Sequence, residues 1–577
     1  MKIELAKHSG FCFGVKNSIV RVVEEINSSE DTILVYGPLI HNPQTVEILE
    51  NRGLKTVHSL DEISGSTVAV RTHGVPLDEL RAIREQSSKI LNLTCPRVAR
   101  VQSTIRSHSA GGCHTIIIGD ACHAEVVGLK SFSSAGVSVI SSLDELASIP
   151  KADKYLLVSQ TTLDRGLFEA IVKELNALLP NLTVVDTICD STGNRQSDVH
   201  AGIKKGIDTL IVVGGKNSAN TTMLASIGHK NGVKTFHIET EKELSFDSLK
   251  DSKHVLVTAG ASTPGWIINN VLEMLYNIKY QRSNPFFRTI KMLLEFLVRA
   301  NILSAVFAFF STLFIQSAGI FSAFPSLPII SMLYIFSMYS TNNYFDRDFL
   351  KASNSYKYKI YRKYGNQLMV LSLVFLLASF YLIRDYSPLL IALLALSSIF
   401  GLVYFTHPVK KIIDALKVPF IKKIYGSKIV TSIGWLTVVV IVPGIHFHPD
   451  KSLLFFTASL ILCLITQRHL IMGIVAYQGD FIFGRMNLSI WLGSGMTKIL
   501  NRVFVILTFL ACAWAVYQTG YFTLSILLVP LIYYSILLKI TSRIEYPVSL
   551  RYEILTDINF IIAIACFVLV MNINNML

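Results

Sequence analysis

Residues 209–220 read TLIVVGGKNSAN, a run of strand-forming residues that leads directly into a polar, glycine-rich loop. Five further segments of the first half share this design: TILVYGPLIHN (32–42), TVAVRTHG (67–74), TIIIGDACHAE (115–125), YLLVSQTT (155–162) and HVLVTAGAST (254–263). Helix-length amphipathic segments separate them, and strands that alternate with helices indicate parallel sheets. Loops at the carboxyl ends of parallel strands are where α/β folds build ligand sites. We therefore expect several small α/β lobes whose loops meet at one site.

The composition of the chain changes near residues 284–291. The chain has 577 residues, of which 51% are hydrophobic, and its mean hydropathy is +0.47. Charged and apolar residues mix before the change, whereas long apolar runs separated by short basic loops follow it. The second pattern is typical of a polytopic membrane protein. We expect a first domain at 1–278, a linker at 279–293 and an all-α membrane domain at 294–577.

Nine apolar segments of the second half are long enough, or nearly so, to cross about 30 Å of hydrocarbon. They are 295–317, 326–343, 367–383, 387–406, 428–447, 452–475, 499–518, 521–540 and 556–573. The loops at 345–366 and 408–428 are rich in Lys and Arg, so the positive-inside rule places them in the cytoplasm. This predicts an integral protein of the bacterial cytoplasmic membrane, with the first domain in the cytoplasm and the C-terminus outside.

The net charge of +13 lies almost wholly in the second half. It fits positive loops that face anionic lipid, and we expect no nucleic-acid partner. The first residues, MKIELAKHSG, lack the apolar core of a secretory signal. We therefore expect the first half to remain in a reducing compartment, where disulfides are rare.

Three of the eight cysteines lie in loop-to-helix contexts: Cys12 in SGFCFGV, Cys95 in LTCPRV and Cys189 in TICDSTGNRQ. A helix N-terminus stabilises the thiolate, which is the form that binds metal. Three unrelated buried thiols are one interpretation, and three convergent ligands of zinc or of an iron–sulfur cluster are the other. The absence of a CxxC pair argues against a structural zinc site. With only three protein ligands, a four-iron cluster keeps one iron open for substrate.

Histidines and small polar residues follow the predicted strands. His41, His73 and His123 lie in three of the loops, and Asn42, Ser218, Asn220 and Ser262 occupy corresponding places. Imidazoles, amides and hydroxyls together fit an anion pocket large enough for a diphosphate. Glu125 is either a solvated acid or a proton donor to a leaving hydroxyl group.

Nine motifs closely resemble the 4-hydroxy-3-methylbut-2-enyl diphosphate reductase family in order and spacing. They are GFCFGV, IHN, THG, TCP, HAEV, QTT, ICDSTGNRQ, GGKNSAN and TAGAS, and they cover residues 1 to about 278. The resemblance implies a three-lobed α/β trefoil around a central cavity. It also implies reductive dehydroxylation of the substrate to isopentenyl and dimethylallyl diphosphate, with ferredoxin or flavodoxin as electron donor. A diphosphate-binding module that holds zinc or no metal is the alternative function.

The same resemblance assigns roles to residues. Cys12, Cys95 and Cys189 would ligate one [4Fe–4S] cluster; His41, His73, Ser218, Asn220 and Ser262 would hold the diphosphate, with His123 beside it; Glu125, helped by Thr161, would deliver protons. Two positions depart from the family. Ala219 stands where some members have serine, and residues 123–125 lack a proline that many members have. The first departure puts one diphosphate contact in doubt.

The second half resembles the UbiA-like intramembrane prenyltransferase superfamily in its nine spans and two motif remnants. Members carry NDxxDxxxD and DxxGDxxxG motifs, whose carboxylates bind Mg²⁺ and a prenyl diphosphate. Here Asp346, Asp348 and Asp480 remain, whereas Asn343, Leu350 and Ala476 stand at other acid positions. The resemblance implies a candidate Mg²⁺ site at Asp346 and Asp480, since one acid per motif can suffice. A non-catalytic anchor or lipid-binding scaffold is the alternative.

Overall fold

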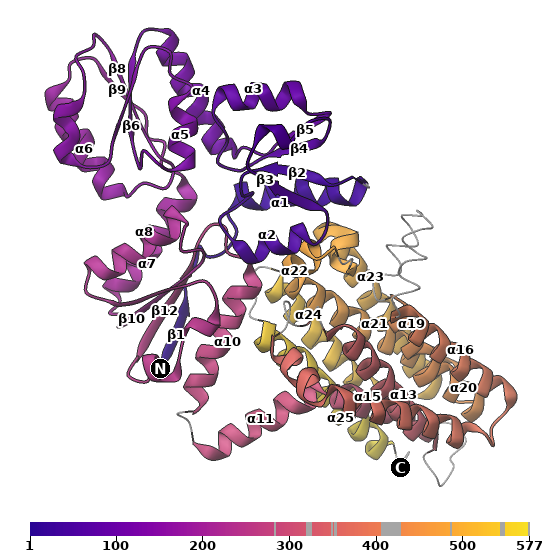
Figure 1. Cartoon of the computed structure of the whole chain (residues 1–577). Helices are drawn as coiled ribbons and strands as arrows, with labels where there is room; N and C mark the ends of the chain where they lie inside the picture. The colour runs from indigo at the N-terminus through magenta and orange to yellow at the C-terminus, as the bar shows by residue number, and fades with distance from the viewer. Residues whose placement is uncertain are drawn as a thin grey trace. The chain divides into compact units, whose positions relative to one another are not determined.

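The computed structural model describes residues 1–29, 31–281, 284–318, 326–347, 350, 355–405, 429–484, 487–542 and 549–574. The chain divides into two compact units, Met1–Tyr280 with Ile482–Gly484, and Gln281–Phe481 with Arg485–Leu577. All strands of the described residues belong to the first unit, in the indigo-to-magenta part of Figure 1, whereas the described part of the second unit is helical.

The first unit contains three four-stranded parallel sheets. Their strands are β1 (Lys2–Leu5), β2 (Ile33–Tyr36), β3 (Leu54–Val57), β4 (Thr67–Val70), β5 (Lys89–Asn92), β6 (His114–Ile118), β7 (Val137–Ile140), β8 (Tyr155–Ser159), β9 (Leu182–Val184), β10 (Thr209–Val213), β11 (Lys234–Ile238) and β12 (His254–Ala259). The helices are α1 (Phe13–Ser28), α2 (Pro43–Glu50), α3 (Leu77–Gln86), α4 (Pro96–Ala110), α5 (Ala124–Lys130), α6 (Arg165–Leu178), α7 (Asp190–Lys204), α8 (Ala219–Lys230), α9 (Phe246–Leu249) and α10 (Gly265–Gln281).

The three sheets repeat one topology. Their strand orders are β3-β2-β4-β5, β7-β6-β8-β9 and, read in the same direction, β11-β10-β12-β1. The third sheet therefore takes its last strand from the start of the chain, and Lys2 of β1 pairs with His254 of β12. The six strands expected from the sequence are the two central strands of each sheet, so the predicted parallel α/β architecture is confirmed.

Helices cover both faces of the sheets, as the second lobe shows. Ile116 and Ile118 of β6 pack in one cluster with Phe168 of α6, while Ile117 packs in another cluster with Val101 of α4 and Val126 of α5. A strand that is buried on both faces needs apolar residues at every position. This explains the unbroken apolar runs by which the central strands are recognised in the sequence.

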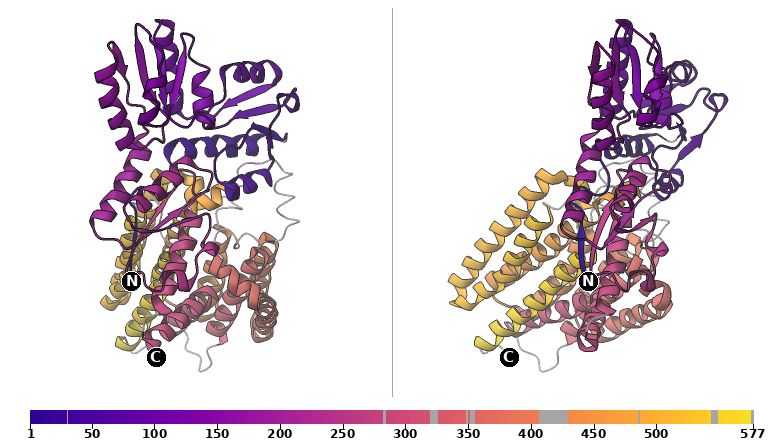
Figure 2. Two further views of the ribbon diagram at one scale, coloured as in Figure 1. Left: turned by 60° about the vertical axis from the view of Figure 1, so that its left-hand side comes forward. Right: turned by 90° about the vertical axis from the view of Figure 1, so that its left-hand side faces the viewer.

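The second unit is a set of apolar helices. They are α11 (Pro285–Arg299), α12 (Ile302–Ser317), α13 (Ser326–Phe345), α15 (Ser355–Ile383), α16 (Pro388–Phe405), α19 (Ile429–Trp435), the π-helix η4 (Leu436–Ile441), α20 (Val442–Phe447), α21 (Lys451–Val475), α22 (Tyr477–Ile482), α23 (Leu488–Thr519), the 3₁₀-helix η5 (Phe522–Leu528), α24 (Val529–Thr541) and α25 (Ser549–Ile573). Figure 2 shows the long helices lying alongside one another, and contacts join α12 to α13, α13 to α15, and α21 to α23.

Each of the nine predicted spans falls on helix, but fewer helices qualify as spans. Among the described residues, five helices are long and apolar enough to cross a membrane, or six if α11 and α12, which are bent by 69°, form one broken span. The apolar helices at 388–402 and 431–447 are shorter, and the end of α13 is polar at residues 340–343. The structure therefore supports a membrane domain of five or six candidate spans, and the count of nine is not confirmed. The basic loop at 408–428 lies outside the described residues, so the orientation stays a prediction.

Candidate functional site

Each of the three predicted cluster cysteines is the N-cap of a helix. Cys12 precedes α1, Cys95 precedes α4 and Cys189 precedes α7. These helices follow β1, β5 and β9, which are the equivalent edge strands of the three sheets. The first N–H groups of a helix lack partners within the helix, and Cys12 Sγ accepts one of them from Val15 at 3.5 Å. The N-terminus of a helix favours the thiolate form, and burial opposes this effect at Cys95 and Cys189.

The backbone anchors the three cysteines in equivalent ways. The N–H groups of Cys12, Cys95 and Cys189 donate to the carbonyl oxygens of Ala261, Thr72 and Thr161, each at 2.9 Å. Those acceptors follow β12, β4 and β8, so each cysteine is tied to the end of a central strand. The three thiols thus occupy corresponding places in the three lobes.

The thiols also lie close to one another. A Cβ atom at Gly14 would lie 2.6 Å from Cys95 Sγ and 3.9 Å from Cys12 Sγ, so glycine is required where α1 approaches Cys95. Burial raises the pKa of Cys95 and of Cys189, and neighbouring thiolates raise both further. In the described part of the chain, no three side chains of His, Cys, Asp or Glu are arranged so that together they could hold a metal ion. A cluster of several irons presents more widely separated positions to its ligands.

Three imidazoles from two lobes form one group. The ring centroids of His41 and His73 are 4.6 Å apart, and His123 lies 6.1 Å from His41 and 5.8 Å from His73. Burial lowers the pKa of all three, to about 4 for His41, and the charge of Arg71 lowers each further. The rings are therefore neutral at pH 7 and offer both N–H donors and nitrogen acceptors.

The third lobe brings its loops to the same histidines. Ser262 Oγ donates to the carbonyl oxygen of His41 at 3.0 Å, and a Cβ atom at Gly215 would lie 2.7 Å from that oxygen. Ser218 caps α8, and Asn220 in its first turn is 4% exposed. His41 Nε2 and both polar atoms of the Asn220 side chain are buried without a hydrogen-bond partner in the described chain. Buried polar atoms of this kind indicate a ligand site, because leaving them unpaired is costly.

Glu125 and Thr161 form a buried pair. The carboxyl group of Glu125, a residue that is 1% exposed, accepts the Thr161 N–H at 2.7 Å and hydrogen-bonds the Thr161 hydroxyl at 2.9 Å. Burial raises the pKa of Glu125, although both hydrogen bonds oppose the shift. His123 Nδ1 accepts the Glu125 N–H at 3.2 Å, which places this acid beside the imidazole group. The pair therefore places a carboxyl group with a raised pKa beside the imidazole group.

In the second unit, one candidate magnesium ligand lies on a helix and the other directly after a different helix. Asp480 on α22 is 9% exposed and accepts a hydrogen bond from Asn487 Nδ2 at 2.8 Å. Asp346 follows the end of α13 and is half-buried. Asn343, at an acid position of the first motif, donates to the Tyr361 hydroxyl at 3.2 Å, so this residue serves packing here. Asp348 lies outside the described residues.

A second buried acid of this unit is paired with arginine. Arg468 on α21 and Asp557 on α25 join through Nε–Oδ1 and Nη2–Oδ2 contacts of 2.9 and 3.3 Å. The guanidinium also lies over the rings of Tyr339 and Phe560, at 5.8 and 5.5 Å from their centroids. Paired charges are the arrangement that membrane interiors tolerate.

Comparison with known proteins separates the two halves. A sequence model described as "LytB protein" matches residues 3–276. The chain is 37% identical over 281 residues to the 4-hydroxy-3-methylbut-2-enyl diphosphate reductase of Clostridioides difficile (strain 630), a stretch that is 48% of this chain and 100% of that relative. The chain belongs to the LytB family. Membership confirms the resemblance expected from the nine motifs and implies an iron–sulfur cluster.

Solved structures resemble each half. One is that of (E)-4-hydroxy-3-methyl-but-2-enyl diphosphate reductase, at 32% identity over 48% of this chain and 100% of that chain, with a TM-score of 0.39. Another is a UbiA homolog from Archaeoglobus fulgidus bound to GPP and Mg²⁺, at 10% identity over 48% of this chain and 99% of that chain, with a TM-score of 0.31.

Two arginines of the LytB half were not predicted from the sequence to belong to the site. Arg71 follows β4, donates through Nε to the Gly74 carbonyl at 3.2 Å, and is the positive charge that acts on all three histidines. Arg195 on α7 is 3% exposed and donates to the carbonyl oxygens of Gly10, Ser191 and Ala259 at 2.5, 2.8 and 3.2 Å. It thus ties the segment before Cys12 to α7, the helix that follows Cys189. Both arginines stand inside quoted motifs, RTHG and ICDSTGNRQ, but no pattern distinguishes them from surface charges.

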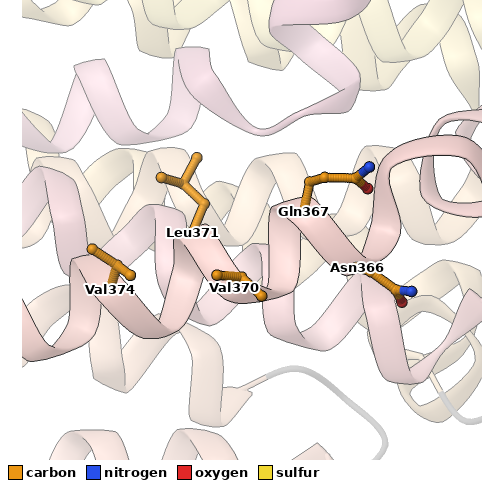
Figure 3. Close-up of a pocket in the computed structure, with 5 residues that line it drawn as sticks. All are labelled: Asn366, Gln367, Val370, Leu371 and Val374. Atoms are coloured by element: carbon orange, nitrogen blue, oxygen red, sulfur yellow. The ribbon is translucent and has the colours of Figure 1, made fainter.

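A hollow on the second unit is not part of either site. Its lining residues all come from one face of α15, as Figure 3 shows: Asn366, Gln367, Val370, Leu371 and Val374. Val370 and Val374 are more than half exposed on a candidate membrane span. An apolar face of this kind suits lipid chains rather than a polar substrate.

Proposed function

We propose that residues 1–278 reduce (E)-4-hydroxy-3-methylbut-2-enyl diphosphate, with loss of its C4 hydroxyl group. Two electrons and two protons are consumed, the C4–O bond breaks, and the products are water with isopentenyl or dimethylallyl diphosphate. The observation that carries the proposal is the threefold repeat at the site, because each lobe delivers one helix-capping cysteine beside one polar strand-end loop. A relative that is 37% identical over 281 residues, its full length, is named for this reaction.

Cys12, Cys95 and Cys189 are the proposed ligands of one [4Fe–4S] cluster. When bound, the cluster supplies the electrons and leaves one iron without a protein ligand for the substrate. The raised pKa values of Cys95 and Cys189 mean that these thiols keep their protons until iron displaces them. Cluster binding should therefore release protons and weaken at acidic pH.

His41, His73, His123, Ser218, Asn220 and Ser262 are the proposed diphosphate ligands. The unpartnered atoms of His41 and Asn220 gain hydrogen bonds from the bound anion, which offsets the cost of burying them. Arg71 supplies the positive charge near imidazoles that are themselves neutral. A bound diphosphate favours protonated imidazole, so binding should be accompanied by proton uptake.

Glu125 is the proposed proton donor, with Thr161 holding its carboxyl group in place. The raised pKa keeps Glu125 protonated to a higher pH than an exposed glutamate, as a general acid requires. His123 is the next candidate, because its ring accepts the Glu125 N–H.

The test is anaerobic purification of the full chain followed by turnover with the diphosphate substrate and reduced ferredoxin or flavodoxin. We expect a brown protein and formation of both five-carbon diphosphates. A colourless protein that binds the diphosphate without reducing it would favour the binding-module alternative.

For the second half we propose an integral membrane domain that transfers prenyl groups, with Mg²⁺ held by Asp346 and Asp480. The specific support is Asp480, a nearly buried acid that accepts a hydrogen bond from the neutral side chain of Asn487. Membranes carrying the protein should therefore convert labelled dimethylallyl or longer prenyl diphosphates to labelled lipid when Mg²⁺ is present. Asp346→Asn and Asp480→Asn should each abolish transfer while leaving reduction intact. A scaffold would transfer no label in any variant.

A further inference from the structure

Helix α11, which opens the second unit, has two chemically distinct faces. Lys291, Glu295 and Arg299 recur at four-residue spacing and so share one side of the helix. Ile290, Leu293 and Phe296 recur at three-residue spacing and lie on another side. Asn284 caps the helix through a hydrogen bond from the Phe286 N–H at 2.9 Å, so the segment begins as an independent helix and not as a continuation of α10.

The charged face of α11 is buried and its apolar face is exposed, which is the opposite of what is expected for a helix in water. The charged side chains are turned inward, with exposed fractions of 16% for Lys291, 14% for Glu295 and 4% for Arg299. Their ion pairs join Lys291 Nζ to Glu295 at 3.3 Å and Arg299 Nη1 to Glu295 at 3.8 Å. The apolar side chains are turned outward, with Leu293 56%, Phe296 42% and Ile290 40% exposed. A surface helix in water buries its apolar side and exposes its charges.

The direction of α11 differs from that of the helix that follows it. The chain bends by 69° between α11 and α12, where Asn301 adopts the left-handed conformation with φ of 60°. α11 has 15 residues, about 22 Å at 1.5 Å per residue, which is too short to cross a bilayer alone. If α12 crosses the membrane, α11 lies closer to the membrane plane than to its normal.

The surroundings of α11 indicate which partner covers its apolar side. α11 contacts α12 and α25, and α25 contains the candidate span Tyr552–Ile573. The outward sides of other candidate spans are equally apolar, since Leu377 on α15 is 70% and Leu510 on α23 is 62% exposed. The outward side of α11 thus has the same apolar character as the outward sides of these candidate spans, which suits acyl chains. Arg288, exposed near the start of the helix, adds a positive charge of the kind that lipid phosphate attracts.

We propose that α11 lies in the membrane interface, with Ile290, Leu293 and Phe296 in the acyl chains and its ion pairs turned toward the protein. It is then a lipid-bound surface helix and not the first half of a span. The inference rests on the proposed membrane placement of the second half. Because α11 begins four residues after α10 ends, the chain meets the bilayer surface as soon as it leaves the first unit.

Cysteine accessibility in proteoliposomes tests the proposal with the full-length protein. The background variant Cys122→Ser removes the exposed native thiol. Leu293→Cys reports on α11, Leu510→Cys on a candidate span, and Asp78→Cys, whose native side chain is 90% exposed on α3, on a site in water. The vesicles contain phosphatidylethanolamine and phosphatidylglycerol, and each variant is treated with a membrane-impermeant maleimide. A fluorophore attached to the same thiols reports quenching by brominated acyl chains.

We expect Leu293→Cys to react at least about tenfold more slowly than Asp78→Cys, and its fluorophore to be quenched as at Leu510→Cys. Reaction of Leu293→Cys at the rate of Asp78→Cys would place α11 in water and overturn the proposal. Protection without quenching, while Leu510→Cys is quenched, would mean that protein covers α11, for example a second copy of the chain. If Leu510→Cys is also fully reactive, the membrane placement of the whole second half is wrong.

Discussion

Replacing Glu125 by glutamine removes one proton from the site while leaving its shape unchanged. The wild-type carboxyl group is 1% exposed and has two partners, the N–H and the hydroxyl of Thr161, at 2.7 and 2.9 Å. Because burial raises the pKa of Glu125, the neutral acid is the form that the site favours. Glutamine reproduces that form, since its oxygen accepts the Thr161 N–H and its amide donates to the hydroxyl.

The expected effects on stability and on turnover therefore differ in size. Both hydrogen bonds persist, so the free energy of unfolding should change by less than about 1 kcal/mol. Loss of a general acid typically lowers turnover by about 100-fold, which corresponds to about 2.7 kcal/mol of transition-state stabilisation. The pH profile should change as well. In the wild-type protein, activity falls as the pH rises through the raised pKa of Glu125, and the variant should lose this dependence.

The assay is anaerobic turnover of the diphosphate substrate with a chemical reductant, together with visible absorbance, substrate affinity and Tm. Thr161→Ser is the matched control, because it keeps the hydroxyl partner and should retain turnover within a few-fold. A Glu125→Gln variant with wild-type turnover would refute the assignment of the acid and direct attention to His123. Loss of cluster absorbance in this variant would show instead that Glu125 supports the fold.

Three other changes test other parts of the molecule. Replacing any one of the three helix-capping cysteines by serine should remove both the iron–sulfur absorbance and the reductase activity. The control variant Cys113→Ser should keep both. A helix-capping variant that retained the cluster would refute the proposed set of ligands. The pKa of His41 is lowered to about 4 in the folded protein, so protonation below about pH 6.5 favours the unfolded chain. The free energy of unfolding should therefore fall by about 2 kcal/mol between pH 7 and pH 5. His41→Gln should reduce this pH dependence, as measured by thermal unfolding followed by visible absorbance. Asp557→Asn leaves Arg468 without its carboxylate partner. The free energy of unfolding in detergent should fall by about 3–5 kcal/mol, measured as a lower Tm. The double variant Arg468→Met, Asp557→Leu replaces the ion pair by apolar side chains and should recover most of this loss. An Asp557→Asn protein with unchanged Tm would mean that water reaches the pair.

The strands show how far the sequence predicts the fold. Central strands such as β6, HTIII, are buried at every position and stand out as apolar runs. Edge strands such as β3, LKTV, bury only their first and last residues, and β9 buries none of its three residues fully. Their pairing is decided by the neighbouring strand and not by their own composition. The sequence therefore did not predict any of the six edge strands, and it did not predict the order of the strands in the sheets.

The candidate site was predictable where chemistry is concentrated in one loop. The cysteines, the histidines and Glu125 lie beside glycines or predicted strand ends, so the sequence indicated that they are candidate site residues. Arg195 could not be recognised, because its role depends on the carbonyl oxygens of Gly10 and Ala259, which lie far away in the sequence. The count of nine spans was not confirmed among the described residues for a related reason: apolar length alone does not reveal the bend at Asn301 or the short helix at 431–447.

The pairing of β1 with β12 sets an order of events during synthesis. Lys2 leaves the ribosome at the start of translation, but its partner His254 follows only after the first two lobes have been made. At 5–20 residues per second this is a wait of roughly 10–50 s. During that time β1 has no partner strand and Cys12 has no fixed place beside Cys95. A nascent chain that stops short of β12 can therefore fold two lobes but cannot assemble all three cysteines. Binding of the proposed cluster by all three cysteines can therefore begin only after β12 has been made, when the ribosome is already translating the apolar helices of the second unit.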